Sequence, residues 1–152
     1  MTQPRTRTGR ALFRGLLAAL LTAACLTTAV QSAQAASEPV LAGLTVTPDT
    51  STVGTGVQVV GTATNTTGST VTAAMGIDLS GALVSTAVSG NHCTPRHLTT
   101  LIYCAVSLPP NASASITFTA TARSTGVYDF RSYARIQYAT DNSFAYATLT
   151  VS

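Results

Sequence analysis

The chain has few charged residues, no lysine and no tryptophan. Only 9% of its 152 residues are charged, and all eight basic residues are arginines. Four of them lie before residue 15, which leaves four arginines and five acidic residues in the rest of the chain, a net charge of 4 − 5 = −1. Nucleic acids and anionic lipids are bound by clustered Lys and Arg. The composition therefore argues against both as partners.

Long unbranched helix formers are also scarce beyond residue 35, where Thr, Ala, Ser, Val and Gly dominate. Thr and Val are stiff at the first side-chain torsion and fit the pleated surface of a sheet. We therefore expect an all-β domain with no helix after the first 35 residues.

Residues 1–35 have the organisation of a secretory signal peptide, which is helical while it is attached. A positive segment with four arginines is followed by an apolar run and by Ala33 and Ala35 in an A-x-A arrangement. The apolar run is shorter than a membrane span and is interrupted by Thr and Cys. Cleavage after Ala35 is the prediction, and a permanent N-terminal anchor is the alternative. The expected location is secreted, outside the cell.

Cys25 leaves a second possibility open. The stretch "LTAAC" resembles the lipobox of bacterial lipoproteins, although Thr22 stands where that motif favours Leu. A lipidated Cys25 would place the protein on the cell surface. Contact with a membrane is expected only through the leader or through this lipid.

Beyond the leader, we expect a flexible arm over residues 36–43 and one domain over residues 44–152. Apolar and polar residues alternate with period 2 in four clear stretches, and four weaker ones accompany them. Turn sequences such as "NTTGST", "LPPNAS" and "ATDNS" separate them. About seven or eight short strands with such turns indicate a β-sandwich or a barrel.

The alternation also predicts which side chains face the core. The predicted inward positions are Ile116, Phe118, Ala120 and Ala122; Tyr128, Phe130, Ala134, Ile136 and Tyr138; Val57, Val59, Gly61 and Ala63; and Ala145, Ala147, Leu149 and Val151.

Cys93 and Cys104 remain once the leader is removed. An exported chain meets oxidising conditions, where such a pair usually forms a disulfide. Closing a loop of about a dozen residues contributes on the order of 3 kcal/mol in the chain-entropy model. Ile102 and Val106 should share the face of Cys104.

Two other interpretations of the cysteine stretch stay open, a metal site and free thiols. Zinc takes four Cys or His ligands, but the spacing of His92, Cys93, His97 and Cys104 contains no C-x-x-C or H-x-x-x-H unit. The disulfide is therefore preferred, and neither a metal nor a cofactor is expected.

An enzyme is not expected either. Catalysis by a nucleophile needs a base and an orienting group beside it. The two histidines are the only near-neutral bases and share one segment, and no G-x-S-x-G elbow is present. Asp78, Asp129 and Asp141 are far apart in the sequence and indicate no glycosidase pair.

One candidate ligand site remains. Tyr133 alternates outward with Arg131, Arg135 and Gln137, and exposed aromatic rings are typical of sugar-binding faces. The preferred alternative is a tyrosine that covers the edge of the core. Asp141 and Asn142 offer oxygen ligands to calcium, but a hairpin turn explains them better.

Several of these motifs follow one another in the order of a known family. The chain resembles the Ig-like conserved repeat domain of unknown function found in bacterial surface and secreted proteins. The matching positions are Asn65 with Gly68, Cys104, Leu108 with Pro109, Ile116 to Ala122, and Asp141 with Asn142. The chain departs from the pattern at Pro110–Asn111, where the family usually has a glycine-containing turn. It also carries one copy where arrays are common.

The resemblance implies an Ig-like antiparallel β-sandwich with a spacer, adhesive or interaction role and no catalytic residues. We therefore expect a non-catalytic module, secreted or associated with the cell envelope, with a structural or protein-interaction role. Its partner would be an envelope or extracellular protein or glycan. The alternative is a small binding module for a polysaccharide or a hydrophobic ligand, which a face with two or more exposed tyrosines would favour.

Overall fold

The computed structural model describes residues 38–79 and 83–152. The predicted leader, its cleavage site and Cys25 lie outside these residues. Within them, no helix has both the length and the apolar character needed to cross a membrane.

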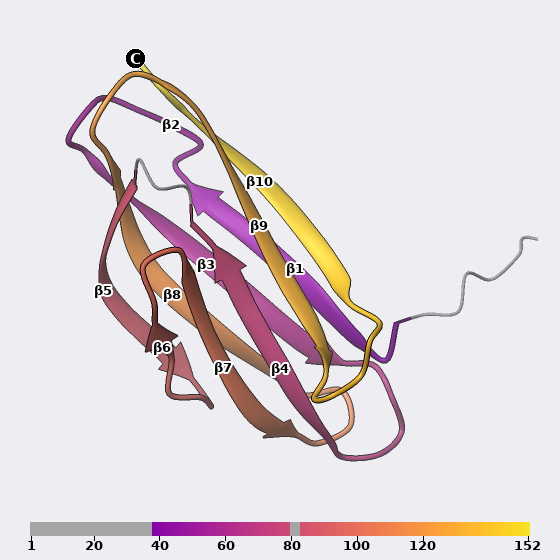
Figure 1. Cartoon of the computed structure of the whole chain (residues 1–152). Helices are drawn as coiled ribbons and strands as arrows, with labels where there is room; N and C mark the ends of the chain where they lie inside the picture. The colour runs from indigo at the N-terminus through magenta and orange to yellow at the C-terminus, as the bar shows by residue number, and fades with distance from the viewer. Residues whose placement is uncertain (1–37, 80–82) are drawn as a thin grey trace, which may run out of the picture. The chain divides into compact units, whose positions relative to one another are not determined.

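The described residues form two β-sheets that pack as a sandwich (Figure 1). One sheet has four strands in the order β1 (Val40–Thr47), β3 (Gly56–Asn65), β8 (Ser113–Ala122) and β5 (Leu83–Asn91). The other has six strands in the order β2 (Thr50–Ser51), β10 (Ser143–Val151), β9 (Gly126–Ile136), β4 (Val71–Asp78), β7 (Leu101–Leu108) and β6 (Arg96–His97). All neighbours are antiparallel except β2 and β10, which are parallel. The predicted antiparallel β-sandwich is confirmed; its eight longer strands match the expected number, and β2 and β6 contain two residues each.

The core lies between the sheets and follows the predicted alternation closely. Along β8, Ile116, Phe118 and Ala120 are fully buried, while the threonines between them are partly exposed. Ile102 and Cys104 of β7 are buried, and Val106 packs against the same cluster. Since period 2 places alternate side chains on opposite faces, one face of each strand could be assigned without knowing its neighbours.

Two predictions differ from the structure, the extent of the N-terminal arm and the orientation of Tyr138. β1 begins at Val40, because Val40 is buried and pairs with Asn65 of β3, so residues 40–43 belong to the sandwich and not to the arm. Tyr138 was predicted to face the core and is 90% exposed. β9 ends at Ile136, and Tyr138 has a φ of 66° in the turn that follows, so the alternation no longer applies to it.

Asn65 is a fully buried polar residue at the end of β3. Its Nδ2 donates to the carbonyl oxygens of Ser69 (2.8 Å), Leu108 (2.9 Å) and Pro109 (3.0 Å). Its Oδ1 accepts from the backbone N–H (2.9 Å) and the hydroxyl (2.7 Å) of Thr67. One side chain therefore joins the β3–β4 turn to the end of β7.

The predicted disulfide is present and fastens one side of the sandwich. Cys93 follows β5 of the four-stranded sheet, and Cys104 lies on β7 of the six-stranded sheet, with a Cα–Cα distance of 6.1 Å. Nearby, Nε2 of His97 on β6 hydrogen-bonds the hydroxyl of Ser85 on β5 at 2.7 Å. The disulfide therefore joins the end of β5 to β7, and the hydrogen bond holds the short β6 segment against β5.

Candidate binding site on the outer face of the six-stranded sheet

The outer faces of the two sheets have different chemistry. On β8, the outward residues of the four-stranded sheet are Ser113, Ser115, Thr117, Thr119 and Thr121. On the six-stranded sheet, β7 presents Tyr103, β9 presents Tyr133, and β10 presents Phe144 and Tyr146, while Tyr138 follows β9. Only Tyr128 among the five tyrosines is buried in the core. Aromatic side chains are therefore concentrated on one outer face.

The ring of Tyr133 reaches over the neighbouring strand β4. The strand register places Gly76 of β4 between Tyr133 of β9 and Tyr103 of β7. A Cβ atom added at Gly76 would lie 2.6 Å from Cε1 and 2.7 Å from the hydroxyl oxygen of Tyr133, so the ring occupies the space above the glycine. Burial of this ring raises the pKa of Tyr133, an effect that the positive charge of Arg135 opposes.

A depression of about 340 Å³ lies beside this ring. Its floor includes the small side chains of Ala74 on β4 and Ala105 on β7, which pair with each other in the register. Aromatic, apolar and polar side chains, one of them cationic, surround the floor, namely Leu98, Leu101, Tyr103, Tyr133, Arg135, Gln137 and Tyr138. We call these nine residues the tyrosine groove. Mainly apolar walls with a few polar groups are typical of ligand sites.

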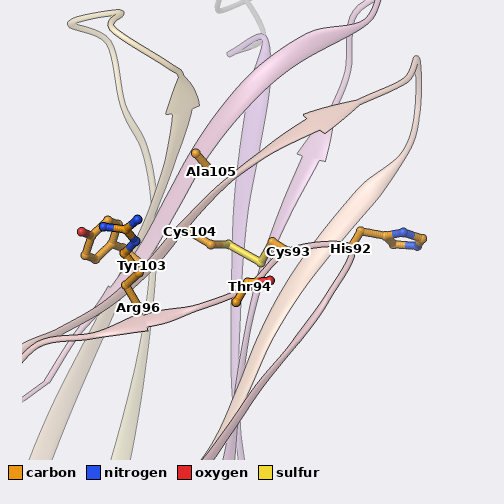
Figure 2. Close-up of a pocket in the computed structure, with 7 residues that line it drawn as sticks. All are labelled: His92, Cys93, Thr94, Arg96, Tyr103, Cys104 and Ala105. Carbon is orange, nitrogen blue, oxygen red and sulfur yellow. A yellow bond between two sulfur atoms is a disulfide. The ribbon is translucent and has the colours of Figure 1, made fainter.

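A second depression of about 620 Å³ adjoins the groove at the disulfide. Tyr103 and Ala105 line both depressions. In Figure 2, Arg96 and Tyr103 lie on one side of the Cys93–Cys104 bond, and His92 lies on the other side with its ring directed away. Arg96 and Tyr103 are register partners on β6 and β7. The two depressions thus form one surface that runs across β9, β4, β7 and β6.

The three residues that the sequence singles out as a candidate ligand site separate in the structure. All three lie on the outward side of β9, as the alternation predicts, and ligand binding by them stays a prediction. Tyr133 and Arg135 line the groove, whereas Arg131 forms an ion pair with Asp78 of β4, with Nε 2.7 Å from Oδ2. The hydrogen bond to Asp78 raises the pKa of Arg131. The Arg131 guanidinium also lies 5.4 Å from the ring centroid of Phe144. Arg131 therefore already has both an anionic and an aromatic partner.

The other two arginines of the face have no carboxylate partner, because the Arg131–Asp78 contact is the one ion pair among the described residues. Nη1 of Arg135 donates a long hydrogen bond of 3.4 Å to the carbonyl oxygen of Ala139. Its Nε atom is buried and has no hydrogen-bond partner. Arg96 is exposed on the edge strand β6, where it is the register partner of Tyr103.

The two histidines have different surroundings. His92 is exposed with a φ of 62°, and His97 bonds Ser85. Within residues 38–79 and 83–152, no three His, Cys, Asp or Glu side chains gather as a metal site would require. Asp141 and Asn142 lie in the β9–β10 turn, where Nδ2 of Asn142 donates to the carbonyl oxygen of Thr140 at 3.1 Å. The hairpin interpretation of that stretch is confirmed.

The sequence interpretation missed Tyr103, Arg96 and the small floor of the groove. The available signal was the stretch "TAAMGIDLS", where Ala74 and Gly76 occupy successive outward positions of β4. Two small residues on the exposed side of a central strand leave room between the side chains of its neighbours. The identity of those neighbours depends on the strand order, which one strand's alternation does not reveal.

No protein-family model matches the sequence, and a comparison with curated proteins finds no match either. Solved structures share the fold. The N-terminal domain of the Streptococcus gordonii adhesin Sgo0707 matches with a TM-score of 0.57 and 12% identity over 74% of this chain and 32% of that one. The bacterial hydrophobin BslA matches with a TM-score of 0.52 and 15% identity over 74% of this chain and 99% of that one.

A CARDB domain from Pyrococcus furiosus, solved in complex with di-metal ions, matches with a TM-score of 0.51. It is 19% identical over 74% of this chain and 91% of that one. At these identities the likeness concerns the fold alone. The chain has the Ig-like β-sandwich fold that occurs in domains of surface proteins.

Proposed function

We propose that the chain is an exported, non-catalytic Ig-like module that binds a polymer of the cell envelope through the outer face of its six-stranded sheet. The unequal chemistry of the two outer faces carries this proposal. Tyr138 and Tyr146 are 90% and 70% exposed, and Phe144 is 45% exposed, all on one face. Exposed aromatic clusters are typical of interaction surfaces.

Two further observations support export and a surface role. Disulfides persist in oxidising compartments outside the cytosol, and Cys93–Cys104 joins the two sheets. The fold is shared with the N-terminal domain of a bacterial adhesin. We include two further points in this proposal. The chain is a member of the Ig-like repeat family, and it is released by cleavage after Ala35. The alternative is retention at the membrane by a lipid on Cys25, which N-terminal mass analysis of the exported protein distinguishes.

Retention on isolated cell-envelope material tests the role. The exported protein should be retained, and a triple substitution Tyr138→Ser, Phe144→Ser and Tyr146→Ser should abolish most of the retention. The matched control substitutes Thr45→Ser and Thr86→Ser, which lie on the four-stranded sheet and are also exposed. Equal retention of the triple variant and the wild type would contradict the proposed binding face.

A further inference from the structure

We propose that the tyrosine groove binds a glycan that carries carboxylate groups, with a sugar ring stacked on Tyr133 and a carboxylate paired with Arg135. This inference rests on the proposed function, because it names the chemistry of the partner at the same face.

Tyr133 is supported as a platform. Its ring lies over Gly76, where any larger residue would displace it, and the backbone of β4 supports the ring from below. Tyr133 lines the same depression as the small residues Ala74 and Ala105. The negative face of an aromatic ring attracts the partly positive C–H groups of a ligand. An aromatic ring beside a groove of small residues therefore suits a sugar ring.

Arg135 supplies the charge. Its guanidinium lines the groove, has no carboxylate partner among residues 38–79 and 83–152, and retains a buried Nε without a hydrogen-bond partner there. The planar guanidinium matches a carboxylate in a bidentate geometry. Arg96 stands at the other end of the combined surface, on the edge strand β6, and has no acidic partner in the described part of the chain either. Two unpaired cations on either side of two aromatic rings complement an anionic sugar chain better than a neutral one.

The extent of the surface favours an oligosaccharide over a single sugar. The surface runs from Tyr133 on β9 to Arg96 on β6, which are three strand intervals apart. At about 4.8 Å per interval this span is roughly 14 Å. A nucleic acid fits the surface less well, because its affinity depends on many phosphate contacts. Of the residues that the structure describes, only two arginines without a carboxylate partner line this surface.

Binding measured by calorimetry tests the inference, with oligogalacturonate as the anionic probe and a neutral dextran oligosaccharide for comparison. The exported protein should bind oligogalacturonate more tightly than dextran, and added salt should weaken that binding. Arg135→Gln should lower the affinity for oligogalacturonate about tenfold or more, since hydrogen bonds to charged groups contribute about 1.5–3 kcal/mol. Arg123→Gln is the matched control, because Arg123 is an exposed arginine in the β8–β9 turn, and it should change the affinity less than twofold.

Tyr133→Leu separates stacking from charge and should weaken binding of both sugars. Circular dichroism must show that each variant keeps its fold. Equal affinity of Arg135→Gln and wild type for oligogalacturonate would overturn the inference. The inference would also be overturned if inorganic polyphosphate bound as tightly as oligogalacturonate and its affinity did not depend on Tyr133. Charge alone would then explain the binding. Retention on envelope material by the aromatic face, without binding to oligogalacturonate, would refute the inference and leave the proposed function intact.

Discussion

Replacing Asn65 by Asp should unfold the sandwich more readily than any conservative surface change, although the two side chains have nearly the same shape. Asn65 is fully buried, and its Nδ2 faces the carbonyl oxygens of Ser69, Leu108 and Pro109. The substitution Asn65→Asp exchanges this donor for an acceptor. Because the two side chains have nearly the same shape, no cavity forms. The decrease in the free energy of unfolding therefore reflects the change in polar interactions and not a loss of packing.

The magnitude follows from the groups left without a partner. An unsatisfied buried polar group costs about 1–3 kcal/mol. The Leu108 carbonyl is in a fully buried contact, whereas the Ser69 and Pro109 contacts are partly buried and can regain water. We expect a loss of about 3–4 kcal/mol at neutral pH. At roughly 4 °C per kcal/mol for a domain of this size, Tm should fall by roughly 12–16 °C.

The loss should also depend on pH. Burial raises the pKa of a carboxyl above its unfolded value of about 3.9. The folded variant therefore holds its proton more tightly than the unfolded one, and its stability decreases as pH rises from about 4 through the folded pKa. Urea denaturation at pH 4 and pH 7 should show a smaller deficit relative to wild type at pH 4. Asn65→Ala introduces no titrating group, so its deficit should be the same at both values. A deficit of Asn65→Asp below about 1 kcal/mol, or one that is unchanged by acid, would refute this reasoning.

Three further predictions concern the disulfide and the groove. Cys93→Ala, Cys104→Ala and the double variant should each lower the free energy of unfolding by about 3 kcal/mol, and additive losses in urea denaturation would show that no bond joins them. Because burial raises the pKa of Tyr133, the wild type should lose more stability above about pH 10 than Tyr133→Phe does, as urea denaturation at alkaline pH would show. Ala105→Leu should leave stability within about 1 kcal/mol of wild type, because position 105 is exposed, and should weaken binding of oligogalacturonate by filling the groove.

Local alternation was sufficient to predict most of the sandwich. β8 shows why, since Ile116, Phe118 and Ala120 could face the core only if the intervening threonines faced outward. The same rule failed at Tyr138, because alternation does not indicate where a strand ends. The chain leaves β9 after Ile136, and the N–H of Ala139 bonds the Ile136 carbonyl in a turn.

The groove depends on strand order and could not be predicted in the same way. Tyr103 and Tyr133 line the same groove only because β4 pairs with both β7 and β9 and carries Gly76 between them. Neither the alternation of β7 nor that of β9 contains this information. The sequence also could not show that Asp78 would pair with Arg131 and leave Arg135 without an acid, since that choice is set by the register of β4 against β9.

The contact between Tyr133 and Gly76 also has a purely structural explanation. Glycine weakens a strand, and an aromatic ring from the neighbouring strand can cover the exposed backbone. That explanation accounts for the position of the ring but not for its surroundings. Ala74 and Ala105 remain small where larger residues would bury more apolar surface against Tyr103 and Tyr133. A face shaped for stability alone would fill this space, whereas a face that receives a ligand must leave it open. The response of binding, and not of stability, to a larger residue at position 105 therefore decides between the two explanations.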